Sequence, residues 1–312
     1  MKLSLILMVW NTSHLLARTL QTLRQSGLKR EEWELLVIDD CSEDDVLGTL
    51  NNYALDLPVV YRRLEHDMGM RGNTAALNTG IAQAQGEVVM WSTPEVMLPP
   101  GALAAVYEKA VGGHAWVTLP SHGLTASIQL RLDQVDWLTD LHRIQTLVAD
   151  LPVDAFDVLW FYYNFFPNGL REGLSYQTLG KPYGNNQTVG VLRTEWLEKI
   201  GRFPYFLDYG SDDPWIAGNR RARGYTDVTL WDFDAYHQWH PPLTFWMAQG
   251  KAPHWNRWGH TTSNLWPDPQ VPSGGTCEIW DGGDHSPMTD SEKSAILTLW
   301  PDVSATGFRP KP

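Results

Sequence analysis

Short runs typical of strands alternate with segments of helical spacing along the first 110 residues. The run 3–9 (LSLILMV) is almost wholly apolar, and the others are 34–40 (ELLVIDD), 59–63 (VVYRR) and 87–91 (EVVMW). Between the first two, leucines recur at the spacing of one helix face. Because strands that are apolar throughout need cover on both faces, the alternation predicts an α/β fold. We expect a mostly parallel, Rossmann-like sheet with helices on both faces.

Helix boundaries are indicated by capping residues. Ser13 is placed to cap the first helix and Gly27 to end it, and Ser42 is placed to cap the second. A third helix is expected at 74–85, closed by Gly86. The second half continues with a strand at 186–193, a helix at 194–201, a helix begun by Pro214 and ended by Gly224, and a strand at 227–231.

Polar residues gather directly after the predicted strands. They are Asn11 and Thr12, Asp39 and Asp40, and Thr93 to Glu95. In open parallel sheets, ligands bind beyond the carboxyl ends of the strands, so these positions predict a binding site. The second half adds Asp212 and Asp213, with His237 and His240. Each also has a structural interpretation, since Asp40 can cap a turn and Asp213, before Pro214, is a good helix cap.

Composition excludes several classes of protein. The 24 Lys and Arg against 36 Asp and Glu give a net charge of −12, which disfavours nucleic acid as a partner. The two cysteines, Cys41 and Cys277, are too few for a disulfide framework and fit either a reducing compartment or simple packing. The apolar N-terminus is predicted to be a strand rather than a signal peptide, and no run approaches the ~18 to 20 apolar residues of a membrane span. We therefore expect a cytoplasmic protein.

Four blocks of sequence, in order, resemble one enzyme family. They are SLILMVWNTSHLLARTLQTL, VIDDCS, LNTGIAQAQGEVVMW and GNNQTVGVLRTEWLEKIGRFPYFLDYGSDDPW. They are similar to the inverting, nucleotide-sugar-dependent glycosyltransferases of the GT-A fold, the family-2-like enzymes that include cellulose, chitin and hyaluronan synthases. The resemblance covers roughly residues 1–110 and 183–240. It implies transfer of a sugar to an acceptor hydroxyl, such as that of a glycan.

The resemblance implies a divalent metal on the donor diphosphate. The family usually carries Asp-x-Asp where this chain has Thr93-Pro94-Glu95, so Glu95 keeps the last acid and Thr93 replaces the first. By position His237, and after it His240, would complete the metal ligands. Carboxylate oxygens suit Mg²⁺ or Mn²⁺, and a histidine nitrogen favours Mn²⁺.

The resemblance also assigns roles to other residues. It implies that Asp213 is the general base and that Asp212 supports it or binds the acceptor. The donor, most often a UDP-sugar in this family, would be bound by Trp10, Asn11, Thr12, Asp39, Asp40, Arg71, Asn78, Thr93 and Pro94. Trp215 and Trp239 are the candidates for stacking on the acceptor, because aromatic faces stack on sugar rings.

The expected organisation is a GT-A domain over 1–240, with a donor half at about 1–110 and an acceptor half at about 111–240. Residues 241–312 would form an extension rich in Trp. Two alternatives stay open: a catalytically inactive homologue that binds nucleotide sugar or glycan, and a transferase that acts on modified bases of DNA. A nucleotide-dependent oxidoreductase is disfavoured, since no GxGxxG follows the first strand.

Overall fold

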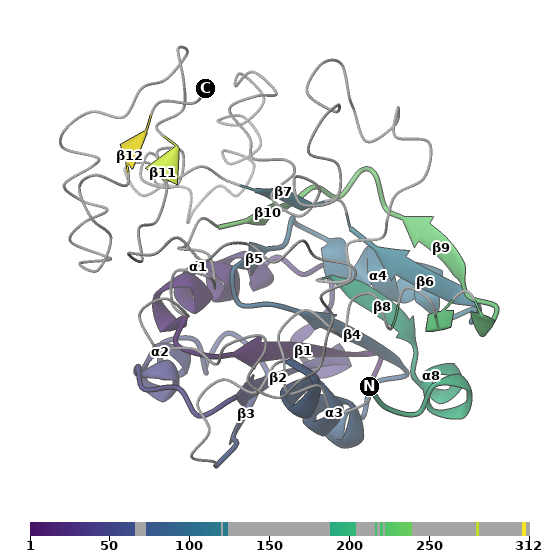
Figure 1. Cartoon of the computed structure of the whole chain (residues 1–312), viewed down its shortest axis with the longest axis horizontal. Coiled ribbons are helices and arrows are strands. Elements are labelled where there is room, and N and C mark those ends of the chain that lie inside the picture. The colour runs from purple at the N-terminus through teal and green to yellow at the C-terminus, as the bar shows by residue number, and fades with distance from the viewer. Residues whose placement is uncertain are drawn as a thin grey trace. The chain divides into compact units, whose positions relative to one another are not determined.

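The computed structural model describes residues 1–65, 73–119, 121–123, 188–203, 216, 219–220, 222–238, 279–280 and 308–309. In chain order the elements are β1 (Leu3–Val9), α1 (Ser13–Leu23), the 3-10 helix η1 (Arg30–Glu32), β2 (Trp33–Asp39), α2 (Val46–Asn51), β3 (Val59–Arg63), α3 (Asn73–Gln83), β4 (Val88–Ser92), β5 (Val96–Met97), α4 (Ala102–Ala110), β6 (Ala115–Thr118), β7 (Ser121–Gly123), β8 (Val189–Leu192), α8 (Arg193–Lys199), β9 (Thr226–Thr229), β10 (Ala235–His237), β11 (Ile279–Trp280) and β12 (Phe308–Arg309) (Figure 1).

The chain divides into two compact units. Unit 1 comprises Met1–Ser121, Tyr176–Ala235 and Trp255–His260, and unit 2 comprises His122–Ser175, Tyr236–His254 and Thr261–Pro312. Unit 1 holds a seven-stranded sheet, and in unit 2 β11 pairs in parallel with β12. The predicted boundary at residue 240 stays a prediction. Within the described part of the chain, no helix has the length and apolar character needed to cross a bilayer.

The sheet of unit 1 is mostly parallel, as predicted. Its strand order is β3-β2-β1-β4-β8-β6-β9 (Figure 1). The strand β1 pairs in parallel with β2 and β4, and β2 pairs in parallel with β3. Only β8 runs against its neighbours β4 and β6, among the pairs described. The carboxyl ends of β1 to β4 therefore lie at one edge, where the loops after them gather.

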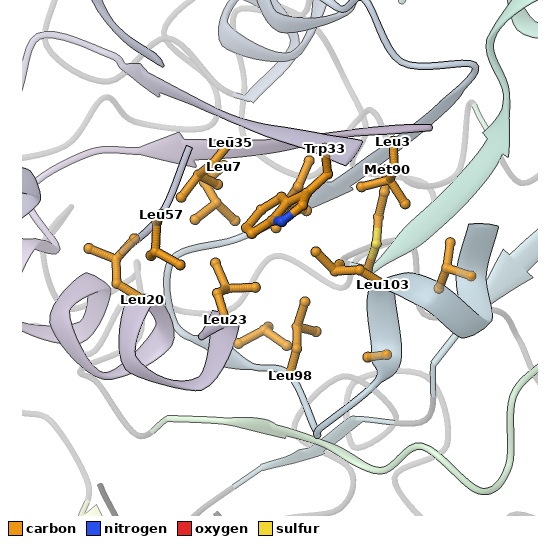
Figure 2. Packing of buried hydrophobic residues seen from close by; sticks show 14 of the residues in the cluster. Leu3, Leu7, Leu20, Leu23, Trp33, Leu35, Leu57, Met90, Leu98 and Leu103 are labelled. Atoms are coloured by element: carbon orange, nitrogen blue, oxygen red, sulfur yellow. The ribbon is translucent and has the colours of Figure 1, made fainter. Parts of the chain in front are cut away.

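Both faces of the sheet are buried. Alternate residues of β1 belong to different clusters: Leu5 and Leu7 pack on one face, and Ile6 and Met8 on the other. The first cluster includes leucines of α1 and α4, and Figure 2 shows Leu20, Leu23 and Leu103 beside Trp33 and Met90 of the sheet. The second includes residues of α3 and α8. This two-sided burial explains why the central strands β1, β2 and β4 are largely apolar.

The first predicted helix caps differ from the structure. Ser13 is the first residue of α1, its N-cap is Thr12, and no side chain of the cap residue bonds the helix. The Ser13 N–H instead donates to Asp44 Oδ2 at 2.7 Å. The helix ends at Leu23, several residues before Gly27. Asp44, thirty-one residues away, thus takes the place of a local cap. The sequence around Ser13 contains no indication of this distant partner.

Ser42 was also expected to cap a helix, and it does not cap α2. The N-cap of α2 is Asp45, whose carboxylate accepts a hydrogen bond from the Gly48 N–H at 2.8 Å. The Ser42 hydroxyl instead accepts from the Asn11 N–H at 3.0 Å. Ser42 thus connects two loops at the carboxyl edge of the sheet rather than starting a helix.

Gly86 lies where the chain passes from α3 to β4 in close contact with β1. Its N–H donates to Ser4 Oγ at 2.7 Å, and that hydroxyl donates to the buried Glu34 at 2.5 Å. A Cβ at Gly86 would come within 2.4 Å of the backbone nitrogen of Ser4 and 2.6 Å of the carbonyl carbon of Leu3. Backbone atoms of a central strand cannot move aside, so only glycine fits here.

We expect Gly86→Ala to lower the free energy of unfolding by about 1–3 kcal/mol, because the added methyl overpacks this contact. The measurement is the urea midpoint at unchanged slope. Gly112→Ala is the matched control, since no atom lies within 4 Å of a Cβ there, and we expect a change within about 0.5 kcal/mol. Equal losses in the two variants would contradict the packing argument.

Candidate active site

The loops that follow β1, β2 and β4 carry the predicted donor-binding residues. Trp10 to Thr12 follow β1, Asp40 follows β2, and Thr93 to Glu95 join β4 to β5. Because β1 lies between β2 and β4 and runs parallel to both, all three loops leave the sheet at the same edge. The parallel pairing of the strands alone therefore brings the three loops together, whether or not a ligand is bound.

The loops after β1 and β2 are connected by hydrogen bonds. Besides the bond from the Asn11 N–H to Ser42, the Glu43 N–H donates to Asn11 Oδ1 at 2.6 Å. Asn11 has φ +52° and Cys41 has φ +65°, values in the left-handed region that non-glycine residues seldom adopt. The amide oxygen of Asn11, predicted to contact the donor, holds the neighbouring loop.

Asp39 lies fully buried at the end of β2, and protein groups engage both of its carboxylate oxygens. The Ser42 N–H donates to Oδ1 at 2.7 Å. The Tyr61 hydroxyl donates to Oδ2 at 2.7 Å and Arg63 Nη1 donates to the same oxygen at 3.1 Å. Burial, followed by the bond to Asp39, raises the pKa of Tyr61 to about 12, so the phenol keeps its proton. Asp39 therefore anchors the turn that contains Asp40.

Buried hydroxyl groups without a hydrogen-bond partner lie beside this edge. Thr93 is 8% exposed, and its Oγ1 has no partner; the same holds for Ser92 Oγ and for Thr12 Oγ1. A buried polar atom left unsatisfied costs about 1–3 kcal/mol, so a ligand or ordered water is expected to reach these atoms. Glu95, two residues after Thr93, is partly buried.

Helix α1 holds the loop that carries Glu95. The buried Thr19 hydroxyl donates to the Pro94 carbonyl at 2.6 Å, and the Leu98 N–H donates to Thr22 Oγ1 at 3.3 Å. Sequence reasoning did not single out these threonines. The sequence could have indicated them, because both are polar residues on the leucine-rich side of an amphipathic helix. An unsatisfied hydroxyl is costly there, so each hydroxyl needs a hydrogen-bond partner.

Asn78 of α3 binds the backbone of a distant residue with both ends of its amide. Its Nδ2 donates to the Phe203 carbonyl at 2.9 Å, and its Oδ1 accepts from the Phe203 N–H at 2.9 Å. Phe203 also packs against the rings of Trp91 and Trp196. Asn78, predicted to lie in the donor pocket, thus fixes the chain ten residues before Asp213.

The predicted metal ligands fall in different parts of the chain. Glu95 belongs to unit 1, and His237, partly buried in β10, belongs to unit 2, so their pairing stays a prediction. No group of three or more His, Cys, Asp or Glu side chains able to hold a metal occurs among the described residues. Six predicted site residues lie outside the described residues: Arg71, Asp212, Asp213, Trp215, Trp239 and His240.

Comparison with known sequences identifies relatives of the first half. Residues 4–152 match the family model for glycosyl transferase family 2. The poly(ribitol-phosphate) beta-N-acetylglucosaminyltransferase TarS of Staphylococcus aureus is 31% identical over 91 residues, covering 29% of this chain and 16% of TarS. A poly(ribitol-phosphate) beta-glucosyltransferase of Bacillus spizizenii is 27% identical over 119 residues, covering 38% and 19%. The chain thus spans less than a fifth of the length of either relative.

Solved structures share the fold over more of the chain. The crystal structure of residues 1–349 of S. aureus TarS in complex with UDP-GlcNAc matches with a TM-score of 0.55 and 17% identity, over 78% of this chain and 60% of that fragment. The mannosyltransferase PcManGT of Pyrobaculum calidifontis, in complex with GDP-Man and Mn²⁺, matches with a TM-score of 0.50 and 18% identity, over 80% and 61%. Residues 4–152 thus resemble glycosyl transferase family 2, and the chain shares the GT-A fold of these solved structures.

Proposed function

We propose that this protein transfers a sugar from a nucleotide-sugar donor, foremost a UDP-sugar, to an acceptor hydroxyl with inversion at the anomeric carbon. The observation that carries the proposal is the pair of buried hydroxyls on Thr12 and Thr93 that lack a partner. They belong to loops that leave adjacent parallel strands at one edge, next to Glu95. A donor bound across this edge would supply their missing hydrogen bonds.

In this proposal the loops after β1 and β2 bind the nucleoside. The Asp40 carboxylate accepts a hydrogen bond from the imide N–H of uracil or from a ribose hydroxyl, and the backbone of Trp10 to Thr12 frames the base. Arg71 faces the phosphates. Asp39 and Asn11 act through the loops they hold, since their own oxygens are engaged by protein groups. The complexes of TarS with UDP-GlcNAc and of PcManGT with GDP-Man support a nucleotide-sugar donor.

The residues after β4 fit a divalent cation. The unpartnered Thr93 hydroxyl and the Glu95 carboxylate two residues later are hard oxygen ligands. Glu95 would hold the cation, with His237 and His240 as its further ligands, and imidazole nitrogen favours Mn²⁺ over Mg²⁺. When bound, the cation neutralises the charge that develops on the departing diphosphate. Because Thr93 replaces an acid of the family pattern, the cation would have one negative charge fewer beside it than in that pattern.

The acceptor half supplies the base. Asp213 removes the proton from the acceptor hydroxyl as that oxygen attacks the anomeric carbon, from the face opposite the departing diphosphate. Asp212 supports this base or binds the acceptor. Trp215 and Trp239 stack on the acceptor sugar, as aromatic faces do.

Titration calorimetry tests the donor site without knowledge of the sugar. In the presence of Mn²⁺, we expect UDP to bind more tightly than GDP or CDP, and omission of Mn²⁺ to weaken UDP binding, because the diphosphate then lacks its counter-ion. Free UDP-sugars serve as a second set of ligands. If none of the three nucleoside diphosphates binds with or without Mn²⁺, the proposed function fails.

A second candidate is a catalytically inactive homologue that still binds nucleotide sugar, and the replacement of an acid by Thr93 favours it. It predicts UDP binding without release of UDP from any UDP-sugar, whereas the transferase releases UDP slowly even when water is the acceptor. Transfer to modified DNA bases is the third candidate. The net charge of −12 argues against it, because DNA binding relies on contacts with phosphates.

A further inference from the structure

We propose that Arg63 and Tyr61 are positioning residues of the nucleoside site: through Asp39, they hold the turn that presents Asp40. This inference rests on the proposed function, in which Asp40 binds the base. Neither residue was singled out by the sequence, and neither is required to touch the ligand.

The register of the sheet brings both side chains to Asp39. The edge strand β3 pairs in parallel with β2, and Arg63 is the direct partner of Asp39. Tyr61 lies two residues earlier, so its side chain leaves the same face of β3 as that of Arg63, whereas Arg62 leaves the opposite face. The result is a buried carboxylate with two donors from one strand and a third from Ser42. Three donors offset the cost of burying its charge.

Arg63 holds the turn after Asp39 at both ends. Its Nη1 donates to Asp39 Oδ2 at 3.1 Å and to the Ser42 carbonyl at 2.8 Å. Asp40 and Cys41 lie between these two points, and Cys41 has φ +65°. A left-handed conformation at a non-glycine residue persists only where its surroundings enforce it. Without Arg63 the turn can relax at Cys41, and the Asp40 carboxylate moves with it.

The same turn is connected to the loop after β1. Ser42 accepts from the Asn11 N–H, and Asn11 accepts from the Glu43 N–H. A shift of the turn is therefore transmitted to Trp10 to Thr12, which the proposed function places around the base. Hydrogen bonds thus connect the two loops in series, from Arg63 through Asp39 and Ser42 to Asn11.

Arg63 contributes more to the conformation of this turn than to the stability of the fold. Its side chain is 36% exposed, and partly exposed ion pairs contribute only about 0–1 kcal/mol. Tyr61 and the Ser42 N–H still bond Asp39 when Arg63 is removed. The protein should therefore fold without Arg63 and bind the nucleoside less well.

The test compares Arg63→Met with Arg62→Met in the full chain, using UDP and CDP with Mn²⁺ in titration calorimetry. Arg62 is exposed on the same strand, and the two variants lose the same charge. We expect Arg63→Met to weaken UDP binding by about 10-fold and to reduce the preference for UDP over CDP, because one hydrogen bond from a charged group to the base is misaligned.

Binding of Mn²⁺ with inorganic pyrophosphate should change by less than about 2-fold, since no base is involved. Arg62→Met should leave all three affinities unchanged, and Arg63→Lys should recover part of the UDP affinity.

Tyr61→Phe is the second variant, used if Arg63→Met lowers the melting temperature. It removes one donor to Asp39 and keeps the shape of the ring, and we expect the same loss of base preference in weaker form. If wild-type protein binds none of UDP, GDP and CDP, the proposed function is overturned and this inference with it; if it binds GDP but not UDP, only this inference is overturned. If wild type binds but Arg63→Met keeps its affinity and base preference, only the positioning role is overturned. An equal loss in Arg62→Met also overturns it, because the effect is then one of charge alone.

Discussion

Asp213→Asn is expected to lower the rate of UDP release from UDP-sugars by about 10²–10⁴-fold, which is the usual contribution of a positioned general base. An amide has the shape of the carboxylate but cannot take the acceptor's proton. The variant should still bind UDP with Mn²⁺ as wild type does, because the base acts on the acceptor and not on the nucleotide. The measurement is UDP release from a panel of UDP-sugars, alongside calorimetric UDP affinity.

Asp232→Asn is the control for the loss of a charge, since Asp232 is exposed in the turn after β9 and has no role in the proposed reaction. Its turnover should match that of wild type. A rate of UDP release in Asp213→Asn equal to that of wild type would remove the assignment of the base. Loss of UDP affinity together with the rate would instead indicate that the substitution damages the fold.

The strand β1 could be predicted because its sequence records burial on both faces, and its predicted bounds, 3–9, are those of the structure. The edge strand β3 is at most partly buried, and its predicted bounds, 59–63, are also those of the structure. The antiparallel direction of β8 had no such signal. Val189 to Leu192 are apolar in either direction, and their direction depends on where the chain returns to the sheet rather than on the residues of the strand.

The candidate site was predictable in its position but not in its hydrogen bonds. Strand ends could be located from the sequence, and parallel pairing brings them to one edge. The donors that hold Asp39 could not be located in this way. Two of its three donors come from Tyr61 and Arg63, more than twenty residues away. The same limitation applies to Asn78, whose partner Phe203 is 125 residues distant.

Because of these long-range hydrogen bonds, a residue that matches the family pattern need not have the ligand contact that the resemblance implies. A motif residue can lie at the site and still act on the protein rather than on the ligand. Asn11, Asp39 and Asn78 each have side-chain oxygens engaged by backbone or side-chain donors of the protein. Among the described donor-site residues, Thr12 and Thr93 have buried side-chain oxygens without a partner. Direct contact with the donor is therefore best sought at these two residues.

Glu95→Gln is expected to weaken Mn²⁺ binding, measured in the presence of UDP, by at least about 100-fold. Substitution of residues that only support metal ligands typically lowers metal affinity by about 10–100-fold. The loss should be at least as large at Glu95, because Glu95 is proposed to be a ligand itself. Without Mn²⁺, wild type and variant should bind UDP with equal affinity, because Glu95 then has no cation to hold. The measurement is calorimetry with Mn²⁺ at saturating UDP. Glu108→Gln, an exposed position in α4, is the charge-matched control and should behave as wild type.

Thr93→Asp should move the Mn²⁺ affinity in the opposite direction. It adds a carboxylate two residues before Glu95, on a loop that α1 already holds through the Pro94 carbonyl. A second charge beside the cation strengthens binding by electrostatic attraction, which is large where water is excluded. If Glu95→Gln and Thr93→Asp both leave the Mn²⁺ affinity unchanged, the cation is not bound after β4 and the metal assignment fails. If only Glu95→Gln has an effect, the cation lies beyond reach of position 93, and the Thr93 hydroxyl is left to bind the nucleotide sugar itself.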